Sequence, residues 1–128
     1  MTIEERAETA LAIRRNGQGN CCQSVLLALA DQTPLSGQQL AAAAAGLGGG
    51  MGNREGTCGA LVGAGIAAGL SGNAPARFGK SISDDFLASC GAVICKDLKR
   101  LENGKPLCPC EDCIRSAVRA YGKVMGLE

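Results

Sequence analysis

The stretch that decides the fold is CGALVGAGIAAGL, residues 58–70, in which every position is apolar or glycine. It predicts a helix that begins at Cys58, runs to about Ser71 and has Thr57 as its N-cap. A helix without a polar face is buried. Its glycines each cost roughly 1 kcal/mol relative to alanine, which indicates neighbours whose backbones approach closely. The sequence therefore predicts a tightly packed central helix whose N-terminus presents Cys58.

Glycines and prolines divide the rest of the chain into further helices. Three capping patterns, Thr2-x-x-Glu5, Asn20 with Gln23, and Ser36-x-x-Gln39, open predicted helices that run to about Arg15, to Asp31 and through Ala45. Two more are predicted over 83–101 and from Pro109, at a first helical position, to Met125, with a loop at 46–52 and a turn at 103–106. No segment alternates as a strand does. We therefore expect an all-α fold, a compact bundle of about five to six helices around the Gly/Ala-rich helix, in a single cysteine-rich domain over residues 1–128.

Eight cysteines and no histidine among 128 residues restrict the chemistry. Ser-His and Cys-His catalytic pairs, His-ligated zinc and imidazole-ligated haem are all excluded, which leaves metal thiolates, iron–sulfur clusters or reversible disulfides. Glu55 precedes Cys58 by three residues, but a loop carboxylate is typical of solvated surface. Nothing else defines a substrate pocket, so we expect an electron carrier or redox sensor rather than an enzyme.

Charge and hydropathy limit the partners and the location. The net charge is +1, from 13 basic and 12 acidic residues, and aromatic side chains are few, so nucleic acid is not an expected partner. The N-terminal MTIEER lacks the pattern of a signal peptide. The longest apolar stretch, residues 58–70, is too short to cross a bilayer. We expect no membrane insertion and a cytoplasmic location, where clustered cysteines more often bind metal or do redox work than form standing disulfides.

Helical periodicity separates the cysteines into core positions and edge positions. Three cysteines lie within the apolar stripes, the core-facing sides of the predicted helices, and packing is a sufficient explanation for them: Cys22, Cys90 and Cys110. Three others lie at or beyond a stripe's edge, where packing does not explain a thiol: Cys21, Cys95 and Cys113. Cys58 is predicted at a helix N-terminus, which stabilises the thiolate, the form that acts as nucleophile and metal ligand.

The segment Cys108-Pro109-Cys110-Glu111-Asp112-Cys113 has a CxCxxC spacing, which lets two or three sulfurs converge on a metal. Cys110-x-x-Cys113 alone also matches a thioredoxin-like dithiol, although the βαβ context of that motif is absent. Cys108 and Cys110 are therefore second candidates as ligands. Four basic residues near the cysteines would balance the charge of a multi-thiolate centre or form an ordinary solvated face: Lys96, Lys99, Arg100 and Lys105.

The glycine-rich segment 46–52 lacks the Gly-Lys-Ser/Thr of a phosphate-binding loop, and no strand precedes it. We expect instead a backbone that passes close to the centre at Cys58, with N–H groups that donate to sulfur.

Several of these motifs together resemble one known family. They are Asn20-Cys21, Gly46-Leu47-Gly48-Gly49-Gly50-Met51-Gly52, Cys58-Gly59-Ala60-Leu61-Val62-Gly63, Cys95-Lys96-Asp97-Leu98, and Cys113 near a helix start. Over about residues 5 to 125 the chain resembles the C-GCAxxG-C-C family of redox-active proteins. The resemblance implies four defining cysteines, Cys21, Cys58, Cys95 and Cys113. A similar domain occurs beside the haems of split-Soret cytochromes, where it resembles an iron–sulfur site.

The chain departs from the family in its additional cysteines, Cys22, Cys90, Cys108 and Cys110, which would serve as a resolving set, a second metal site or core. Three functions stay open. The first is electron transfer or redox sensing by an iron–sulfur cluster, [2Fe–2S], held by the four defining cysteines within one chain or between two in a homodimer, and serving a redox partner protein. The second is a metal-free thiol–disulfide protein in which Cys95 or Cys113 resolves Cys58. The third is a structural zinc site of four thiolates.

Overall fold

The computed structural model describes residues 1–71 and 76–128, and these are mostly helical, as predicted. Five helices form the bundle: α1 (Ile3–Arg15), α2 (Cys21–Ala28), α4 (Gly59–Leu70), α5 (Ala76–Cys90) and α7 (Cys110–Met125). The other elements connect them: η1 (Ala30–Gln32), α3 (Gly37–Ala44), η2 (Gly50–Arg54), α6 (Cys95–Lys99), β1 (Leu101–Glu102) and β2 (Lys105–Pro106).

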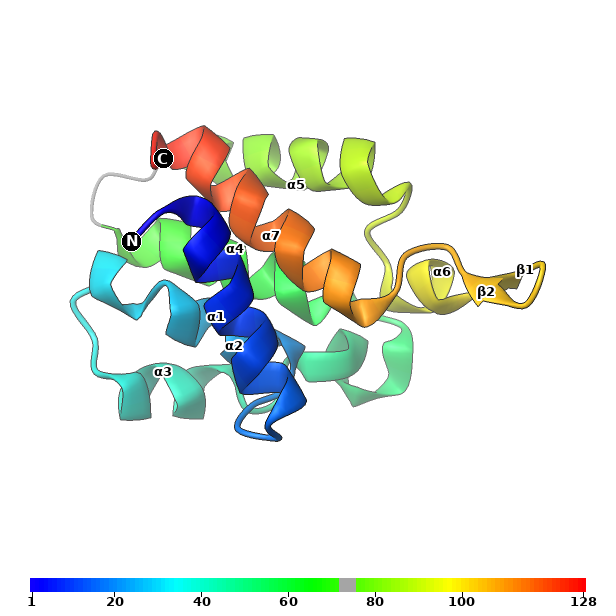
Figure 1. The fold of residues 1–128 in the computed structure, drawn as a ribbon, viewed down its shortest axis with the longest axis horizontal. Helices are drawn as coiled ribbons and strands as arrows, with labels where there is room; N and C mark the ends of the chain where they lie inside the picture. Colours follow the sequence, from blue (N-terminus) through cyan, green and yellow to red (C-terminus); the bar gives the residue numbers. More distant parts are fainter. Residues whose placement is uncertain (72–75) are drawn as a thin grey trace.

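The glycine-rich helix α4 lies at the centre of the bundle, between α2, α5 and α7 (Figure 1). Most of its residues are buried, which confirms the prediction from its composition. Two of its four glycines, Gly59 and Gly63, serve close packing: a Cβ added at Gly63 would lie 2.7 Å from the carbonyl oxygen of Cys22 on α2. Gly65 and Gly69 have open space around them, so the predicted close approach does not extend to them. The predicted N-cap is wrong, because Cys58 rather than Thr57 occupies that position, and Thr57 pairs with Ile94 in an isolated β-bridge.

The three predicted capping boxes are all present at the starts of α1, α2 and α3, each with reciprocal hydrogen bonds. The two ends of the chain meet, because the Ile3 amide donates a 2.7 Å hydrogen bond to the carbonyl oxygen of Glu128 (Figure 1). The core between the helices contains the largest fully buried side chains, Tyr121 and Phe86. α1 therefore packs along α7 and closes the bundle on that side.

The prediction of a single helix over 83–101 is wrong at both boundaries. α5 begins earlier, at Ala76, and stops at Cys90, because Gly91 takes a left-handed conformation with φ of 87°. The chain then bends at Gly91 and Val93, and the extended Ile94 precedes Cys95, where α6 begins. The break places Cys95 at the start of a new helix rather than in the middle of an old one.

Three other features also differ from the predictions. The turn at 103–106 closes a β-hairpin, β1–β2, with Asn103 and Gly104 both left-handed, as a two-residue hairpin turn requires. Strands of two residues are too short to show alternation, so hydropathy alone could not predict them. Pro109 is the N-cap of α7 rather than its first residue, and α2 ends at Ala28, followed by η1 rather than continuing to Asp31.

We call residues 46–58 and 91–109 the cysteine end of the molecule. It lies at one end of the bundle, where α6 and the hairpin project from the helices (Figure 1). Among the described residues, none of the helices combines the length and apolar character that a membrane crossing requires.

Candidate thiol and metal site

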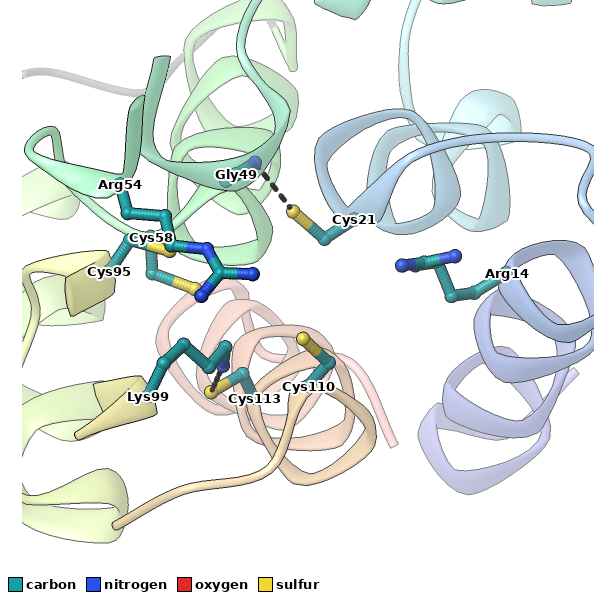
Figure 2. A pocket seen from close by; sticks show the side chains of 10 residues that line it. Arg14, Cys21, Gly49, Arg54, Cys58, Cys95, Lys99, Cys110 and Cys113 are labelled. Carbon is teal, nitrogen blue, oxygen red and sulfur yellow. Dashed lines mark hydrogen bonds between the residues drawn. The ribbon is translucent and has the colours of Figure 1, made fainter. Parts of the chain in front are cut away.

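A cavity of about 200 Å³ lies at the cysteine end. Five cysteines line it: the exposed Cys110, and the four that the sequence singled out, Cys21, Cys58, Cys95 and Cys113 (Figure 2). We call it the four-cysteine pocket, after those four. Each of these cysteines stands at or near a helix start: first in α2, N-cap of α4, first in α6, and in the first turn of α7. Three are buried, and Cys21 is partly exposed. The fold therefore brings together thiols that are far apart in the sequence.

Backbone pairing fixes Cys58 and Cys95 beside each other. The Cys58 amide donates a 2.7 Å hydrogen bond to the carbonyl oxygen of Val93, and the Cys95 amide donates a 3.0 Å bond to that of Gly56. Residues 56–58 and 93–95 thus run antiparallel across the wall of the pocket. This explains why α5 must stop at Cys90, since the extended segment after it is needed for the pairing.

Glycines of the chain pack closely against two of the pocket cysteines. A Cβ added at Gly59 would lie 2.5 Å from the Cys21 sulfur, and one at Gly50 would lie 2.6 Å from the Cβ of Cys95. The Gly49 amide donates a 3.4 Å hydrogen bond to the Cys21 sulfur (Figure 2). The glycine-rich segment passes close to the pocket thiols, as the sequence predicted, and supplies an N–H group to one of them.

Three cations line the pocket: Arg14, Arg54 and Lys99 (Figure 2). Among the described residues, no carboxylate joins them in the lining. The Lys99 ammonium donates hydrogen bonds to the carbonyl oxygen of Cys108, at 3.1 Å, and to the sulfur of Cys113, at 3.5 Å. Burial acts to lower the pKa of Lys99, but the nearby sulfurs of Cys113 and Cys110 outweigh it and leave the pKa raised. The pocket is therefore suited to negative charge.

Sequence reasoning found only part of this positive lining. Of the four basic residues near the cysteines, Lys99 reaches the pocket, whereas Lys96, Arg100 and Lys105 are exposed and do not line it. Arg14 and Arg54 were missed. Arg14 reaches the pocket only because α1 packs on α2, and no sequence signal reports that packing.

Hydrogen bonding sets the protonation of the pocket thiols. A hydrogen bond from Cys113, together with the amides of Leu61 and Ala60 at the start of α4, lowers the pKa of Cys58 to about 6, although burial opposes the shift. The pKa of Cys113 is raised, because its proton is held between neighbouring sulfurs, and burial raises the pKa of Cys95. The contacts around Cys58 therefore favour its thiolate form.

A second group of thiols adjoins the pocket through Cys113. The sulfurs of Cys90, Cys108 and Cys113 all lie within 4.8 Å of one another, and those of Cys113 and Cys108 are 3.3 Å apart. All three residues are buried. We call them the cysteine trio, and this cluster of cysteines can hold a metal ion.

The family model described as "Putative redox-active protein (C_GCAxxG_C_C)" matches residues 19–124, a range that includes all eight cysteines. The chain belongs to this family. No curated protein and no solved structure matches the chain. The resemblance drawn from the sequence motifs is thereby confirmed: the molecule is a C-GCAxxG-C-C protein of a redox-active family, and it carries a cysteine cluster able to bind metal.

The additional cysteines of this C-GCAxxG-C-C protein divide into different environments. Cys22 is fully buried in the core, where burial raises its pKa to about 12, and its predicted packing role is confirmed. Cys110, predicted in the middle of an apolar stripe, is exposed, and Cys113, predicted at an edge, is buried. Cys113 packs into the buried core cluster, whereas Cys110, the first residue of α7, is exposed. Cys90 packs in the core as predicted, and the sequence missed that it also reaches the trio.

Proposed function

We propose that the protein binds one iron–sulfur cluster, of the [2Fe–2S] type, through Cys21, Cys58, Cys95 and Cys113, and that it transfers electrons or senses redox state. The observation that carries the proposal is that these four thiols line a single cavity (Figure 2). Four thiolates meet the ligand requirement of such a cluster. The cluster would supply reversible electron transfer, while the chain binds it and sets its surroundings.

The spacing of the thiols favours a cluster over a single ion. One tetrahedral zinc with bonds of about 2.3 Å holds its sulfurs roughly 3.8 Å apart. Within residues 1–71 and 76–128, one group of three potential ligand atoms lies within 4.8 Å of one another, and that group is the trio. No three of the four pocket thiols are that close. A four-thiolate zinc site is therefore disfavoured in this pocket, and a centre with more than one metal atom fits better.

The charge of the pocket also supports the proposal. An oxidised [2Fe–2S] core with four thiolates is a dianion, and Arg14, Arg54 and Lys99 would balance it. The hydrogen bonds that Gly49 and Lys99 donate to sulfur are of the kind that raises the reduction potential of a cluster, because they stabilise the extra electron. Because Cys21 is partly exposed, a redox partner protein would approach the centre on its side.

The test is metal and sulfide analysis of protein purified without oxygen, together with its visible spectrum. We expect iron and acid-labile sulfide in equal amounts, and Cys58→Ser should abolish the colour. Adjacent residues of α2 provide a matched pair: Cys21→Ala should lose iron, whereas Cys22→Ala, in the core, should retain it. Iron-free wild-type protein, or a Cys58→Ser variant with an unchanged spectrum, would contradict the proposal.

One observation favours a second candidate, a metal-free thiol–disulfide function. Cys58, whose pKa is lowered to about 6, accepts a hydrogen bond from Cys113, which makes Cys113 its resolving partner. Oxidation of metal-free protein with a limiting amount of hydrogen peroxide would then remove one hydrogen from each thiol and reduce the peroxide to water. Peptide mapping should show a Cys58–Cys113 disulfide. A protein that arrives loaded with iron and sulfide would exclude this function for the native form.

A further inference from the structure

Cys113 belongs to two groups of thiols that open on different cavities. It lines the four-cysteine pocket, but its trio neighbours Cys90 and Cys108 do not. Cys108 lines a second cavity of about 440 Å³, together with Ser116 and Asp112. The Cys113 sulfur can therefore serve either the four-cysteine pocket or the trio. A metal bound at one of these sites affects metal binding at the other.

We propose that Cys90, Cys108 and Cys113 form a site for a single Zn²⁺ ion, and that zinc at this site withholds Cys113 from the four-cysteine pocket. The competition rests on the proposed cluster function, whereas the zinc site itself does not.

The geometry of the trio fits one ion. A tetrahedral zinc with three thiolates places the sulfurs about 3.8 Å apart. The sulfurs of the trio lie close to this spacing: those of Cys113 and Cys108 are 3.3 Å apart, and no pair is more than 4.8 Å apart. Small side-chain rotations would therefore close the site without any change in the backbone.

The second cavity can supply the fourth ligand. Zinc sites with three protein ligands keep the remaining position for water. Because Cys108 lies in the wall of this cavity, water can reach an ion bound in the trio from that side. The cavity lies outside the four-cysteine pocket, so the ion would not need to enter through the cluster site.

Neighbouring groups support thiolates at this position. Zinc with three thiolates carries one net negative charge, and the half-buried Lys99 ammonium, hydrogen-bonded to Cys113, balances it. A side-chain hydrogen bond from Ser116 orients the Cys90 sulfur. Binding forms three Zn–S bonds and releases the thiol protons to water, with no change of oxidation state.

The first experiment measures ion binding alone. Metal-free protein with eight reduced thiols is titrated with Zn²⁺ against a chromophoric chelator, and with Co²⁺ as a spectroscopic probe whose sulfur charge-transfer bands report the thiolates. Cys90→Ala and Cys108→Ala should each weaken binding more than about a hundredfold, beyond what outer hydrogen-bond partners alone contribute. Three control variants should bind Zn²⁺ as tightly as wild type does: Cys21→Ala, Cys95→Ala and, at an exposed thiol, Cys110→Ala. If Cys90→Ala and Cys108→Ala bound Zn²⁺ as tightly as the wild-type protein does, the proposed site would be wrong.

The second experiment tests the competition. Wild-type protein with one equivalent of Zn²⁺ should take up less than about a tenth of the iron and sulfide taken up by zinc-free protein, because one ligand of four is occupied. Cys108→Ala protein should take up iron and sulfide whether or not zinc is present. Full loading of wild type with zinc and cluster together would overturn the competition. Failure of zinc-free wild type to load would overturn the cluster function and the competition with it, while the Co²⁺ bands would still decide the zinc site.

Discussion

The bundle and the cysteine end are built by different forces. In the bundle, the helices are held by apolar packing around fully buried side chains such as Tyr121 and Phe86. In the cysteine end, backbone hydrogen bonds and contacts among thiols hold the chain. Left-handed residues such as Gly50 allow it to turn. Leu98 is fully buried there, but other large apolar side chains point outward, with Met51 61% exposed and Leu101 66% exposed. The bundle should therefore fold without metal, and the cysteine end should depend on what its sulfurs hold.

Removal of the metal centre should produce the largest difference between the two regions. Hydrogen–deuterium exchange of the holoprotein and of metal-free reduced protein is the measurement. We expect amides of residues 46–58 and 91–109 to exchange at least about tenfold faster after removal, because local opening no longer has to break metal–thiolate bonds. Amides in the middle of α4 and α7 should keep their protection. Equal acceleration throughout the chain would show that the bundle too depends on the metal.

Two glycines of the same helix sharpen the comparison. Gly59 begins α4 at the pocket, where a Cβ would lie 2.5 Å from the Cys21 sulfur and 2.8 Å from the carbonyl oxygen of Leu47. Gly59→Ala should therefore displace Cys21 and lower the iron and sulfide content by more than half. Gly65 lies in the same helix with open space around its Cα. Gly65→Ala should leave metal content unchanged and stabilise the fold by about 0.5–1 kcal/mol.

Metal analysis and thermal unfolding of both variants check this prediction. Full loading of Gly59→Ala would show that the Cys21 side of the pocket can relax, and the four thiols would then be less fixed than the structure shows.

Two lysines of α6 provide a smaller effect. Lys99 is half-buried and donates to the Cys113 sulfur, whereas Lys96 is exposed and does not line the pocket. Lys99→Gln should make the protein lose iron to a chelator about tenfold faster, because one compensating charge is gone. Lys96→Gln should lose iron at the wild-type rate. Equal rates for the two variants would mean that long-range charge, rather than the hydrogen bond to sulfur, stabilises the centre.

The same contrast explains what the sequence could predict. Capping boxes and the apolar helix α4 are encoded within a few residues, so the bundle's elements were predictable. The break at Gly91 was not, because the extended segment after it is stabilised by pairing with residues 56–58, far away in the chain. The family motifs identified the four defining cysteines. They did not identify Cys90, because its position in an apolar helical stripe already explained it, and its contact with Cys108 depends on the tertiary fold.

The smallest predicted effect belongs to the bundle alone. The buried Arg6 on α1 forms an ion pair with the carboxylate of Asp31, and its hydrogen bonds lower the pKa of Asp31 to about 2, from an ordinary value of 3.8. A carboxyl group whose pKa is lower in the folded state contributes stability that is complete above the unfolded pKa and is lost as the pH falls through the folded value. The loss should therefore occur between about pH 4 and pH 2. Because Asp31 is largely exposed, its size should be no more than about 1 kcal/mol.

Urea unfolding of wild type and Asp31→Asn at a series of pH values measures this term. The variant should lack the decline between pH 4 and pH 2 that is specific to Asp31, and at pH 7 it should be less stable by about 1 kcal/mol. Its iron and sulfide content at pH 7 should equal that of wild type, because the ion pair joins α1 to η1 and none of its atoms lines the four-cysteine pocket. Loss of iron from Asp31→Asn would show that the bundle transmits strain to the thiols, and the two regions would then not be independent.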